Sequence, residues 1–292
     1  MKGFHAAIAL LPPMLQCAAE ELTAEEKKTC EELRLRLGYP AAAMIRGREY
    51  DLVSVPVTEE LLRSVMERAT RSSLHAAEEE IRRGYVSAPG GVRVGVCGTA
   101  VLEGERMTGL RDYTSLSIRV PREIPGCADE VWPWVTAGGF RSLLIVSPPG
   151  AGKTTLLREL IRRLSDTGCR VCTADERGEL AGMEKGSAGF QIGRHTDVMT
   201  GVPKALAAGM MLRSMNPEVL AMDEITDPAD GHALLRAVGC GVKLLASVHG
   251  RCPEELTDRP GCGELLAAGA FERCVTVEVR NGVRRYAVRE LL

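Results

Sequence analysis

The chain has 292 residues, of which 45% are hydrophobic, 26% charged and 4% aromatic. These proportions are typical of a soluble globular protein and exclude a collagen-like or largely disordered chain. Lys and Arg total 37 against 39 Asp and Glu, so the net charge is -2. Balanced charge and few aromatic side chains argue against nucleic acid as a partner. At about 150 residues per domain, the length predicts two domains.

The first part of the chain contains three segments that are typical of helices. Glu20–Leu37 is rich in charge, and the apolar residues between Leu61 and Ala69 recur at helical spacing. Ser73–Arg83 is the third segment, and it is shorter.

Strand patterns follow these helical segments. Val92, Val94 and Val96 alternate with other residues, which is the period of a strand. Glu103-Gly104-Glu105 predicts a hairpin turn into a second strand, and Ser117–Val120 predicts a third. We therefore expect a small α+β domain over residues 1–128.

Residues 129–292 show a different pattern, in which short apolar runs alternate with helical segments. This alternation predicts an α/β domain with a mainly parallel sheet covered on both faces. The apolar runs are Leu143–Val146, Arg170–Ala174, Val219–Met222 and Lys243–Val248, and the helical segments include Leu156–Leu164, Leu206–Leu212 and Ala233–Val238. At the end of the chain, Asn281-Gly282 lies between two alternating segments and predicts a hairpin.

Apolar stretches and cysteines bear on where the protein is located. No apolar run reaches the roughly 18 residues of a membrane-spanning helix. Pro12-Pro13 interrupts the nearest one, and Gln16 before Cys17 does not suit a lipoprotein signal. We expect an intracellular, cytoplasmic chain with reduced cysteines, in which Cys169 and Cys172 pack as small apolar residues rather than bind zinc.

A phosphate-binding loop follows the first apolar run. Gly150 and Gly152 let the backbone curl so that its N–H groups face phosphate oxygens. Lys153 supplies a positive charge for the β- and γ-phosphates, and the hydroxyl of Thr154 is a ligand for Mg²⁺. Ser147 stands where the usual pattern begins with Gly. The predicted nucleotide-binding residues are Pro149, Gly150, Ala151, Gly152, Lys153, Thr154 and Thr155.

Two adjacent carboxylates, Asp223 and Glu224, end the third apolar run. Asp223 is placed to hold Mg²⁺, and Glu224 to polarise the attacking water. Glu176 ends the second run and His249 the fourth, so both are further candidates for catalytic roles. Ligands of open α/β sheets bind at the carboxyl ends of the strands, so these side chains should share one crevice.

Hydrolysis of a nucleotide also needs an arginine to neutralise charge in the transition state. Arg194 and Arg213 are candidates in the second domain. Arg93, Arg111, Arg119 and Arg122 are candidates in the first.

With these motifs in place, the chain resembles the stage III sporulation protein AA family of endospore-forming bacteria. More broadly, it is similar to the hexameric ATPases of type II and type IV secretion. In the first domain the resemblance rests on Glu31–Arg36, Glu79–Tyr85 and Gly90–Gly95. In the second it rests on Ser147–Thr155, Asp175–Gly182, Gly193–Asp197, Arg213–Glu224 and Ser247–Gly250.

The resemblance implies a RecA-like P-loop ATPase domain that uses ATP and Mg²⁺, with Glu224 as the catalytic glutamate. It also implies a homo-hexamer that powers a channel between mother cell and forespore. Such a ring would work from the mother-cell cytoplasm, peripheral to membrane-anchored channel components and without a span of its own. Two other functions stay open from the residues alone: a nucleic-acid-associated ATPase and a nucleotide-regulated scaffold.

Overall fold

The computed structural model divides the chain into two compact units. The first comprises residues 1–123 with 182–189, and the second comprises 124–181 with 190–292. The predicted domain boundary after residue 128 lies close to the first of these junctions. The residues that the structure describes are 2–71, 77–104, 106–184, 186–280 and 283–291.

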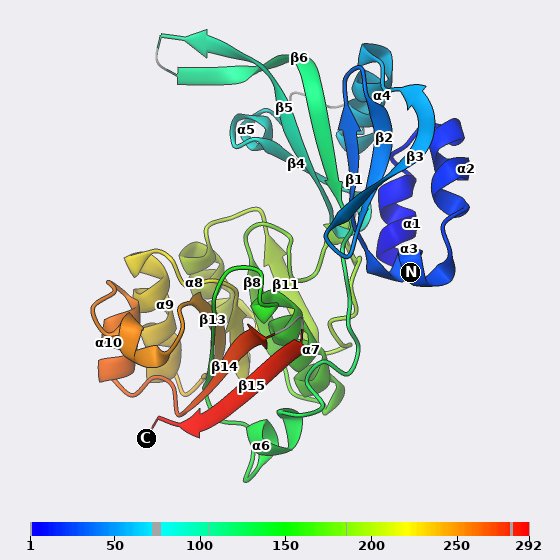
Figure 1. Cartoon of the computed structure of the whole chain (residues 1–292). Coiled ribbons are helices and arrows are strands. Elements are labelled where there is room, and N and C mark those ends of the chain that lie inside the picture. Colours follow the sequence, from blue (N-terminus) through cyan, green and yellow to red (C-terminus); the bar gives the residue numbers. More distant parts are fainter. Residues whose placement is uncertain (1, 72–76, 105, 185, 281–282, 292) are drawn as a thin grey trace. The chain divides into compact units, whose positions relative to one another are not determined.

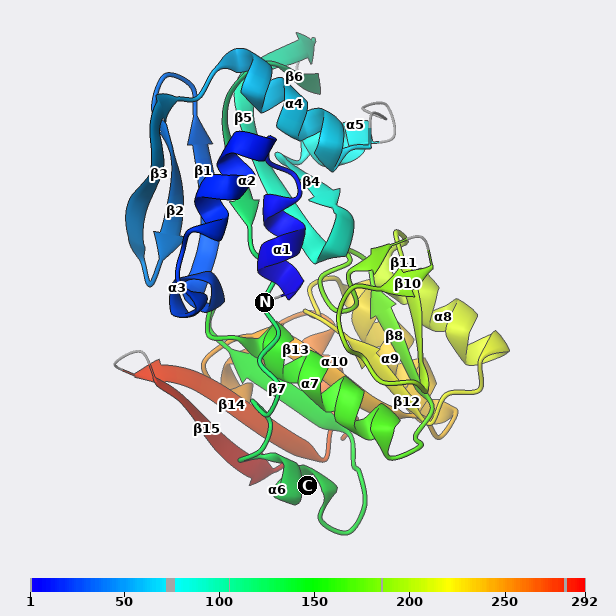
Figure 2. The same ribbon diagram turned by 90° about the vertical axis from the view of Figure 1, so that its right-hand side faces the viewer.

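The first unit is built on a six-stranded antiparallel sheet with the order β3-β2-β1-β6-β5-β4. Helices α1, α2 and α4 lie along one face of this sheet (Figure 1, Figure 2). The elements are α1 (Lys2–Ile8), α2 (Pro13–Glu20), α3 (Ala24–Thr29), β1 (Cys30–Arg36), β2 (Pro40–Ile45), β3 (Arg48–Pro56), α4 (Glu59–Ala69), α5 (Glu78–Arg82), β4 (Tyr85–Ala88), the short 3-10 helix η2 (Pro89–Gly91), β5 (Val92–Glu103), β6 (Arg106–Arg119), β9 (Met183–Glu184) and β10 (Ser187–Ala188).

The core of the first unit lies between the sheet and these helices. Leu62, Val65 and Met66 lie on one face of α4 and are buried, as their spacing predicts. They belong to the same cluster as Leu33 of β1 and Ile118 of β6. One sheet face and one face of each helix therefore form a single hydrophobic core.

The prediction of a helix over Glu20–Leu37 is wrong for most of that segment. A capping box between Thr23 and Glu26 starts the short helix α3, and the chain then enters β1 at Cys30. Leu33 and Leu35 are buried, whereas the charged residues that alternate with them are partly exposed. The alternation has the period of a strand, and the density of charge on the other face concealed it.

Other expectations for the first unit fare better. The helix around Leu61 and the strand from Val92 are confirmed as α4 and β5. Within Ser73–Arg83, residues 78–82 form α5, and residues 72–76 lie outside the described part. The two strands expected after Gly104 are one long strand, β6, paired with β5 across two bulges. Strands β2 and β3 were not predicted.

The second unit is built on a seven-stranded sheet with the order β11-β8-β12-β13-β7-β14-β15. All these pairings are parallel except that of β14 with β15. Helix α7 covers one face, and α8, α9 and α10 cover the other (Figure 1, Figure 2). The elements are α6 (Trp132–Thr136), β7 (Leu143–Ser147), α7 (Lys153–Asp166), β8 (Val171–Asp175), β11 (Thr196–Thr200), α8 (Lys204–Ser214), β12 (Val219–Met222), α9 (Pro228–Gly239), β13 (Lys243–His249), η3 (Pro253–Leu256), α10 (Cys262–Ala267), β14 (Arg273–Arg280) and β15 (Val283–Glu290).

This sheet confirms the predicted α/β class and the four apolar strands. The edge strand β11 was not predicted, because its sequence is polar and its burial is partial. The predicted turn Asn281-Gly282 lies outside the described residues, between two strands that pair as a hairpin. Among the described helices, none is both long and apolar enough to cross a membrane.

The strand register sets where the functional residues lie. Ser147 at the end of β7 pairs with His249 at the end of β13. Met222 at the end of β12 pairs with Ala174 of β8 on one side and with Ala246 of β13 on the other. The carboxyl ends of four parallel strands therefore meet at one edge of the sheet, and the predicted site residues follow directly after them.

Candidate nucleotide site

The predicted phosphate-binding loop connects β7 to α7. Gly150 and Gly152 have φ angles of +75° and +99°, which residues with a Cβ rarely adopt. Pro149 and Gly150 are exposed, whereas Lys153, the first residue of α7, is buried. The N-terminus of a 14-residue helix thus opens directly behind an exposed, curled loop.

A side chain from the far end of the chain touches this loop. The Nε of Arg284 in β15 donates a hydrogen bond to the carbonyl of Ala151 at 3.1 Å. A Cβ added at Gly152 would lie 2.7 Å from the same nitrogen, so a larger residue would displace the Arg284 side chain, while the φ angle alone already favours glycine. Sequence reasoning missed Arg284, because it depends on β14 pairing with β7.

Thr154, Asp223 and Ser247 form one hydrogen-bonded group. The Thr154 hydroxyl donates to Oδ2 of Asp223 at 2.9 Å, and the Ser247 hydroxyl donates to Oδ1. The sequence predicted Thr154 and Asp223 as Mg²⁺ ligands, and the structure brings them together from α7 and from the end of β12. Hydroxyl and carboxylate oxygens are the donors that Mg²⁺ prefers, so these residues fit that ion.

Lys153, Glu224 and His249 form a second group beside the first. Nζ of Lys153 lies 3.2 Å from Nε2 of His249 and 3.9 Å from Oε2 of Glu224. Nε2 of His249 lies 3.3 Å from Oε1 of Glu224. A phosphate bound to Lys153 would compete with Glu224 for the same ammonium group, so the three side chains are suited to respond to a nucleotide.

Glu224 has an unusual backbone. Its φ is +51°, in the left-handed region that non-glycine residues rarely occupy. Its N–H donates to the Ser247 hydroxyl at 3.0 Å. Residues that their surroundings hold in rare backbone conformations occur frequently at functional sites.

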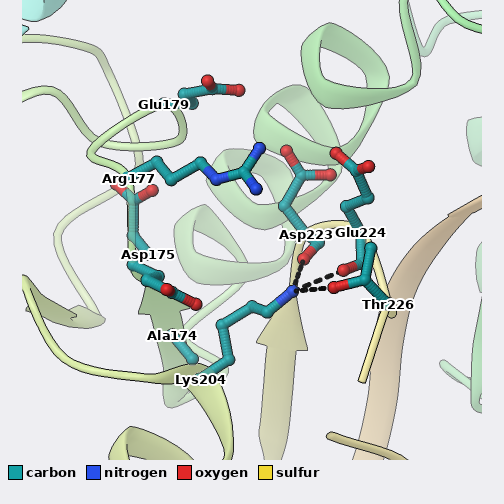
Figure 3. A pocket seen from close by; sticks show the side chains of 9 residues that line it. Ala174, Asp175, Arg177, Glu179, Lys204, Asp223, Glu224 and Thr226 are labelled. Carbon is teal, nitrogen blue, oxygen red and sulfur yellow. Dashed lines mark hydrogen bonds between the residues drawn. The ribbon is translucent and has the colours of Figure 1, made fainter. Parts of the chain in front are cut away.

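The acidic turn after β8 lies at a pocket next to Glu224. Asp175 is buried, and its carboxylate accepts the N–H groups of Leu180 at 3.1 Å and Ala181 at 2.9 Å. Burial raises the pKa of Asp175, although these two hydrogen bonds oppose the rise. Asp175 therefore shapes the turn, and Glu176 is left half-buried at the pocket. Figure 3 shows this pocket.

Within one chain, Arg194 does not lie near the residues that follow the carboxyl ends of the strands. It lies just before β11, whose first residue Thr196 pairs with Val171 at the start of β8. Arg194 is therefore at the amino ends of the strands, whereas the other predicted residues are at the carboxyl ends. Its side chain is exposed, and a role for it stays a prediction.

Two arginine candidates of the first unit differ in their surroundings. Arg122 is bound within that unit, where Nε donates to the carbonyl of Cys30 at 3.3 Å. Arg111 is exposed and lies 3.5 Å from its neighbour Asp112.

Comparison with known proteins places the chain in a family. The family model described as "Sporulation stage III, protein AA" matches residues 12–287. The chain belongs to this family. It is 36% identical over 279 residues to stage III sporulation protein AA of Bacillus subtilis (strain 168), covering 94% of this chain and 90% of that protein.

Solved structures show the fold beyond the family. The pilus retraction motor PilT with bound ADP matches with a TM-score of 0.66 at 18% identity, covering 95% of this chain and 82% of that one. The Legionella pneumophila ATPase DotB matches with a TM-score of 0.63 at 16% identity, covering 95% and 80%. The chain therefore has the fold of the RecA-like secretion ATPases, as its resemblance to them implied.

Proposed function

We propose that this member of the sporulation stage III protein AA family is a Mg²⁺-dependent ATPase. One observation supports this most directly: the ends of three parallel strands, β7, β12 and β13, gather a phosphate-loop lysine and threonine, two adjacent carboxylates and a histidine within hydrogen-bonding or ion-pairing distance. The ATPase domain would span residues 129–292, and an α+β domain would span 1–128.

Each side chain has a role that follows from its chemistry. Lys153 binds the β- and γ-phosphates as a point charge, and residues 149–155 enclose the phosphates with backbone N–H groups. Glu224 orients the attacking water and accepts its proton, and His249 contacts Glu224 and Lys153 on the side of the γ-phosphate. Glu176, at the adjoining pocket, helps to position water.

Thr154 and Asp223 would hold Mg²⁺ together with phosphate oxygens of ATP. The ion would neutralise charge that develops on the transferred phosphoryl group. Ser247 keeps the Asp223 carboxylate turned toward Thr154, since it donates to the carboxylate oxygen that Thr154 does not contact.

Membership of the family supports a role in sporulation. The Bacillus subtilis relative is named as a stage III sporulation protein, and the structural neighbours are a pilus retraction motor and an ATPase. We infer a motor of a secretion-like channel between mother cell and forespore. It would be a homo-hexamer in the mother-cell cytoplasm, bound to membrane-anchored channel components.

Two variants test the reaction. Lys153→Ala should lose nucleotide binding, because the phosphates lose their cation. Glu224→Gln should bind ATP as the wild type does and lose turnover by about 100-fold or more, since an amide is a poor proton acceptor. Lys243→Met, at the opposite end of β13 in an exposed ion pair with Glu272, is the matched control and should behave as the wild type.

The measurements are steady-state phosphate release and binding of a fluorescent ATP analogue. Wild-type turnover by Glu224→Gln would remove Glu224 from the mechanism. ATP binding by the wild-type chain without turnover would instead support a nucleotide-regulated scaffold. Turnover stimulated by DNA or RNA with a steep salt dependence would support a nucleic-acid motor.

A further inference from the structure

A largely buried lysine that sequence reasoning missed lies next to residues 223–226, the turn that carries Glu224. Lys204 is the first residue of α8, and its side chain is 11% exposed. Nζ donates to the carbonyl of Glu224, and it lies 3.4 Å from both the carbonyl of Asp223 and the hydroxyl of Thr226. Figure 3 shows Lys204 reaching these three residues from below.

A carboxylate completes the surroundings of this ammonium group. Oδ2 of Asp230 lies 3.1 Å from Nζ of Lys204, and Asp230 is itself buried. The same oxygen accepts the N–H groups of Thr226 and Asp227, each at 3.3 Å. Residues 223–227 are thus bound on their carbonyl side by Lys204 and on their amide side by Asp230.

Stability of α8 does not explain the position of Lys204. The N-terminus of a helix carries partial positive charge, so a cation in the first turn is unfavourable to the helix. Burying an ammonium group costs further free energy unless its donors are all bonded. The cost to the helix remains, and the burial cost is offset because the ammonium group reaches backbone oxygens of the turn that carries Glu224 and the carboxylate of Asp230.

The two peptide groups of Glu224 are therefore held by side chains from different elements. Its N–H is held by Ser247 of β13 and its carbonyl by Lys204 of α8. Both bonds hold the backbone of Glu224, whose φ is +51°. Such a conformation persists only where the surroundings over-determine it.

We propose that Lys204 is a positioning residue that fixes the Glu224 backbone in its left-handed conformation and thereby aims the carboxylate. The inference rests on the proposed ATPase function. Its consequence is specific: loss of Lys204 should reduce kcat and leave nucleotide binding intact, because Lys153 and the phosphate loop do not depend on it.

The test compares Lys204→Met and Lys204→Arg with the control Lys243→Met in the full-length chain. Lys204→Met should lower kcat by about 10- to 100-fold, the range that a small misplacement of a catalytic group produces. Lys204→Arg keeps the charge but not the three converging donors, so its kcat should be intermediate. Affinity for a fluorescent ATP analogue should stay within about threefold of the wild type in both variants.

Asp230→Asn separates positioning from general stability. It removes the ion pair but keeps an oxygen that can accept the N–H groups of Thr226 and Asp227, and it leaves the bonds from Lys204 to the carbonyls, so it should lower Tm and largely keep kcat. In addition, adding Lys204→Met to Glu224→Gln should cause no further loss of turnover, because both changes remove the same carboxylate function.

Several results would overturn the proposal. These are wild-type kcat in folded Lys204→Met, fully additive losses in the double variant, an equal loss of kcat in Asp230→Asn, or failure of both Lys204 variants to fold. A wild-type chain that binds ATP without hydrolysing it would refute the proposed function instead, so the two failures are distinguishable.

Discussion

Ser247 connects the two acidic residues of the site through a single hydroxyl group. It donates to Asp223 and accepts the N–H of Glu224 at 3.0 Å, and it is fully buried. A hydroxyl can do both at once, because it carries one proton and two lone pairs. The orientation of the Asp223 carboxylate and of the Glu224 backbone therefore depends on the same atom.

Removal of that hydroxyl should impair turnover more than folding. We expect Ser247→Ala to lower kcat by about 10-fold, which is typical when a residue that orients a ligand is lost. The matched control is Ser214→Ala at the exposed end of α8, where the hydroxyl bonds only to the Met210 carbonyl of its own helix turn. Steady-state kinetics with thermal unfolding would check this, and unchanged kcat in folded Ser247→Ala would contradict it.

At the residue scale, the sequence predicts the site as far as local motifs reach. Gly150, Gly152 and Lys153 belong to one contiguous loop, and Asp223 and Glu224 directly follow an apolar strand. Lys204 and Arg284 could not be predicted, because each reaches the site from an element whose neighbours are set by strand order. Each side chain bonds to backbone carbonyls at the site, and such contacts carry no signature in sequence spacing.

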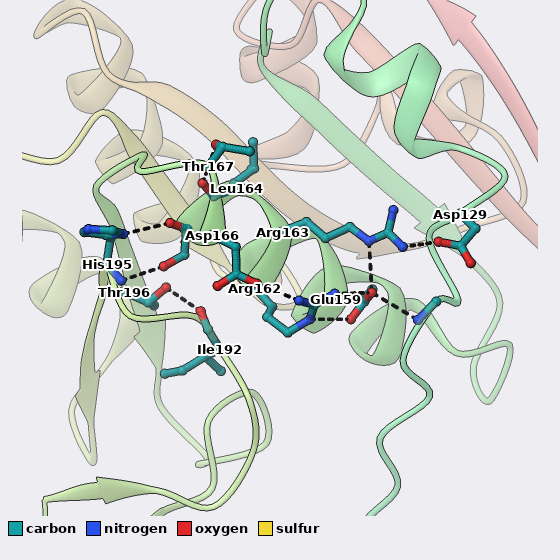
Figure 4. A network of polar contacts seen from close by, with 12 residues as sticks. Asp129, Glu159, Arg162, Arg163, Leu164, Asp166, Thr167, Ile192, His195 and Thr196 are labelled. Carbon is teal, nitrogen blue, oxygen red and sulfur yellow. Dashed lines mark hydrogen bonds and ion pairs between the residues drawn. The ribbon is translucent and has the colours of Figure 1, made fainter.

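At the scale of elements, α7 is fixed by a buried acidic residue. Glu159 is 6% exposed and accepts hydrogen bonds from Arg162, Arg163 and the N–H of Gly126 (Figure 4). Arg163 also pairs with Asp129. The helix that begins at the phosphate loop is therefore tied to the segment that leads into the second unit's sheet.

This network makes a prediction about stability and its pH dependence. Burial raises the pKa of Glu159, but the hydrogen bonds from the two arginines and from Gly126 outweigh it and lower the pKa overall. Its stabilising contribution is thus present above the ordinary glutamate pKa and is lost as pH falls through the lowered value. Glu159→Gln should cost about 2 kcal/mol in the free energy of unfolding at neutral pH, since it removes the buried charge that Arg162 and Arg163 share and leaves each with only its more exposed partner, Asp166 or Asp129.

Chemical denaturation at pH 7 and at about pH 4 would measure the effect, with the gap between variant and wild type narrowing at the lower pH. Asp166→Asn is the control, because its ion pair with Arg162 is nearly half exposed and should be worth less than about 1 kcal/mol. A gap that stays constant from pH 7 to the lower pH would contradict the role given to the Glu159 charge.

The elements themselves were predictable in proportion to how completely each is buried. Strands β7, β8, β12 and β13 are almost fully buried and appear in the sequence as continuous apolar runs. Strands β1 and β11 have one or both faces partly exposed, and their charged or polar residues conceal the alternation. The sequence therefore predicted too few strands for the six-stranded sheet, whereas it predicted the four central strands of the parallel sheet that carries the candidate site.

For the whole molecule, the two units are not simple successive halves of the sequence. Residues 182–189, which carry β9 and β10, belong to the first unit, although they lie between strands of the second. Gly189 packs against the backbone of Gly90, where an added Cβ would lie 3.3 Å away. Cutting the chain near residue 130 would separate residues 182–189 from the rest of the first unit. Experiments on assembly are therefore best done with the uncut chain.

The proposed ring predicts that activity depends on protein concentration. A head-to-tail interface that closes forms a ring, and a site completed by a neighbouring subunit is inactive in the monomer. Specific activity of the wild type should rise with concentration and level off as hexamers form, in parallel with the mass from light scattering. A monomer with full, concentration-independent turnover would refute the ring.

The position of Arg194 allows a stricter test of that ring. Within one chain Arg194 is exposed at the amino ends of the strands, opposite the edge that carries Glu224. In a head-to-tail ring, such a residue can face the nucleotide of the next subunit only by crossing the interface.

We therefore expect Arg194→Ala and Glu224→Gln to be inactive separately and to regain activity when mixed. In an equal mixture, about a quarter of the interfaces would join an intact Glu224 to an intact Arg194, so roughly that fraction of wild-type activity should return. Mixtures of Lys153→Ala with Glu224→Gln serve as the control, because both changes lie on the same side of the interface and no intact site can form. Full activity of Arg194→Ala alone would exclude Arg194 as the arginine that completes the site.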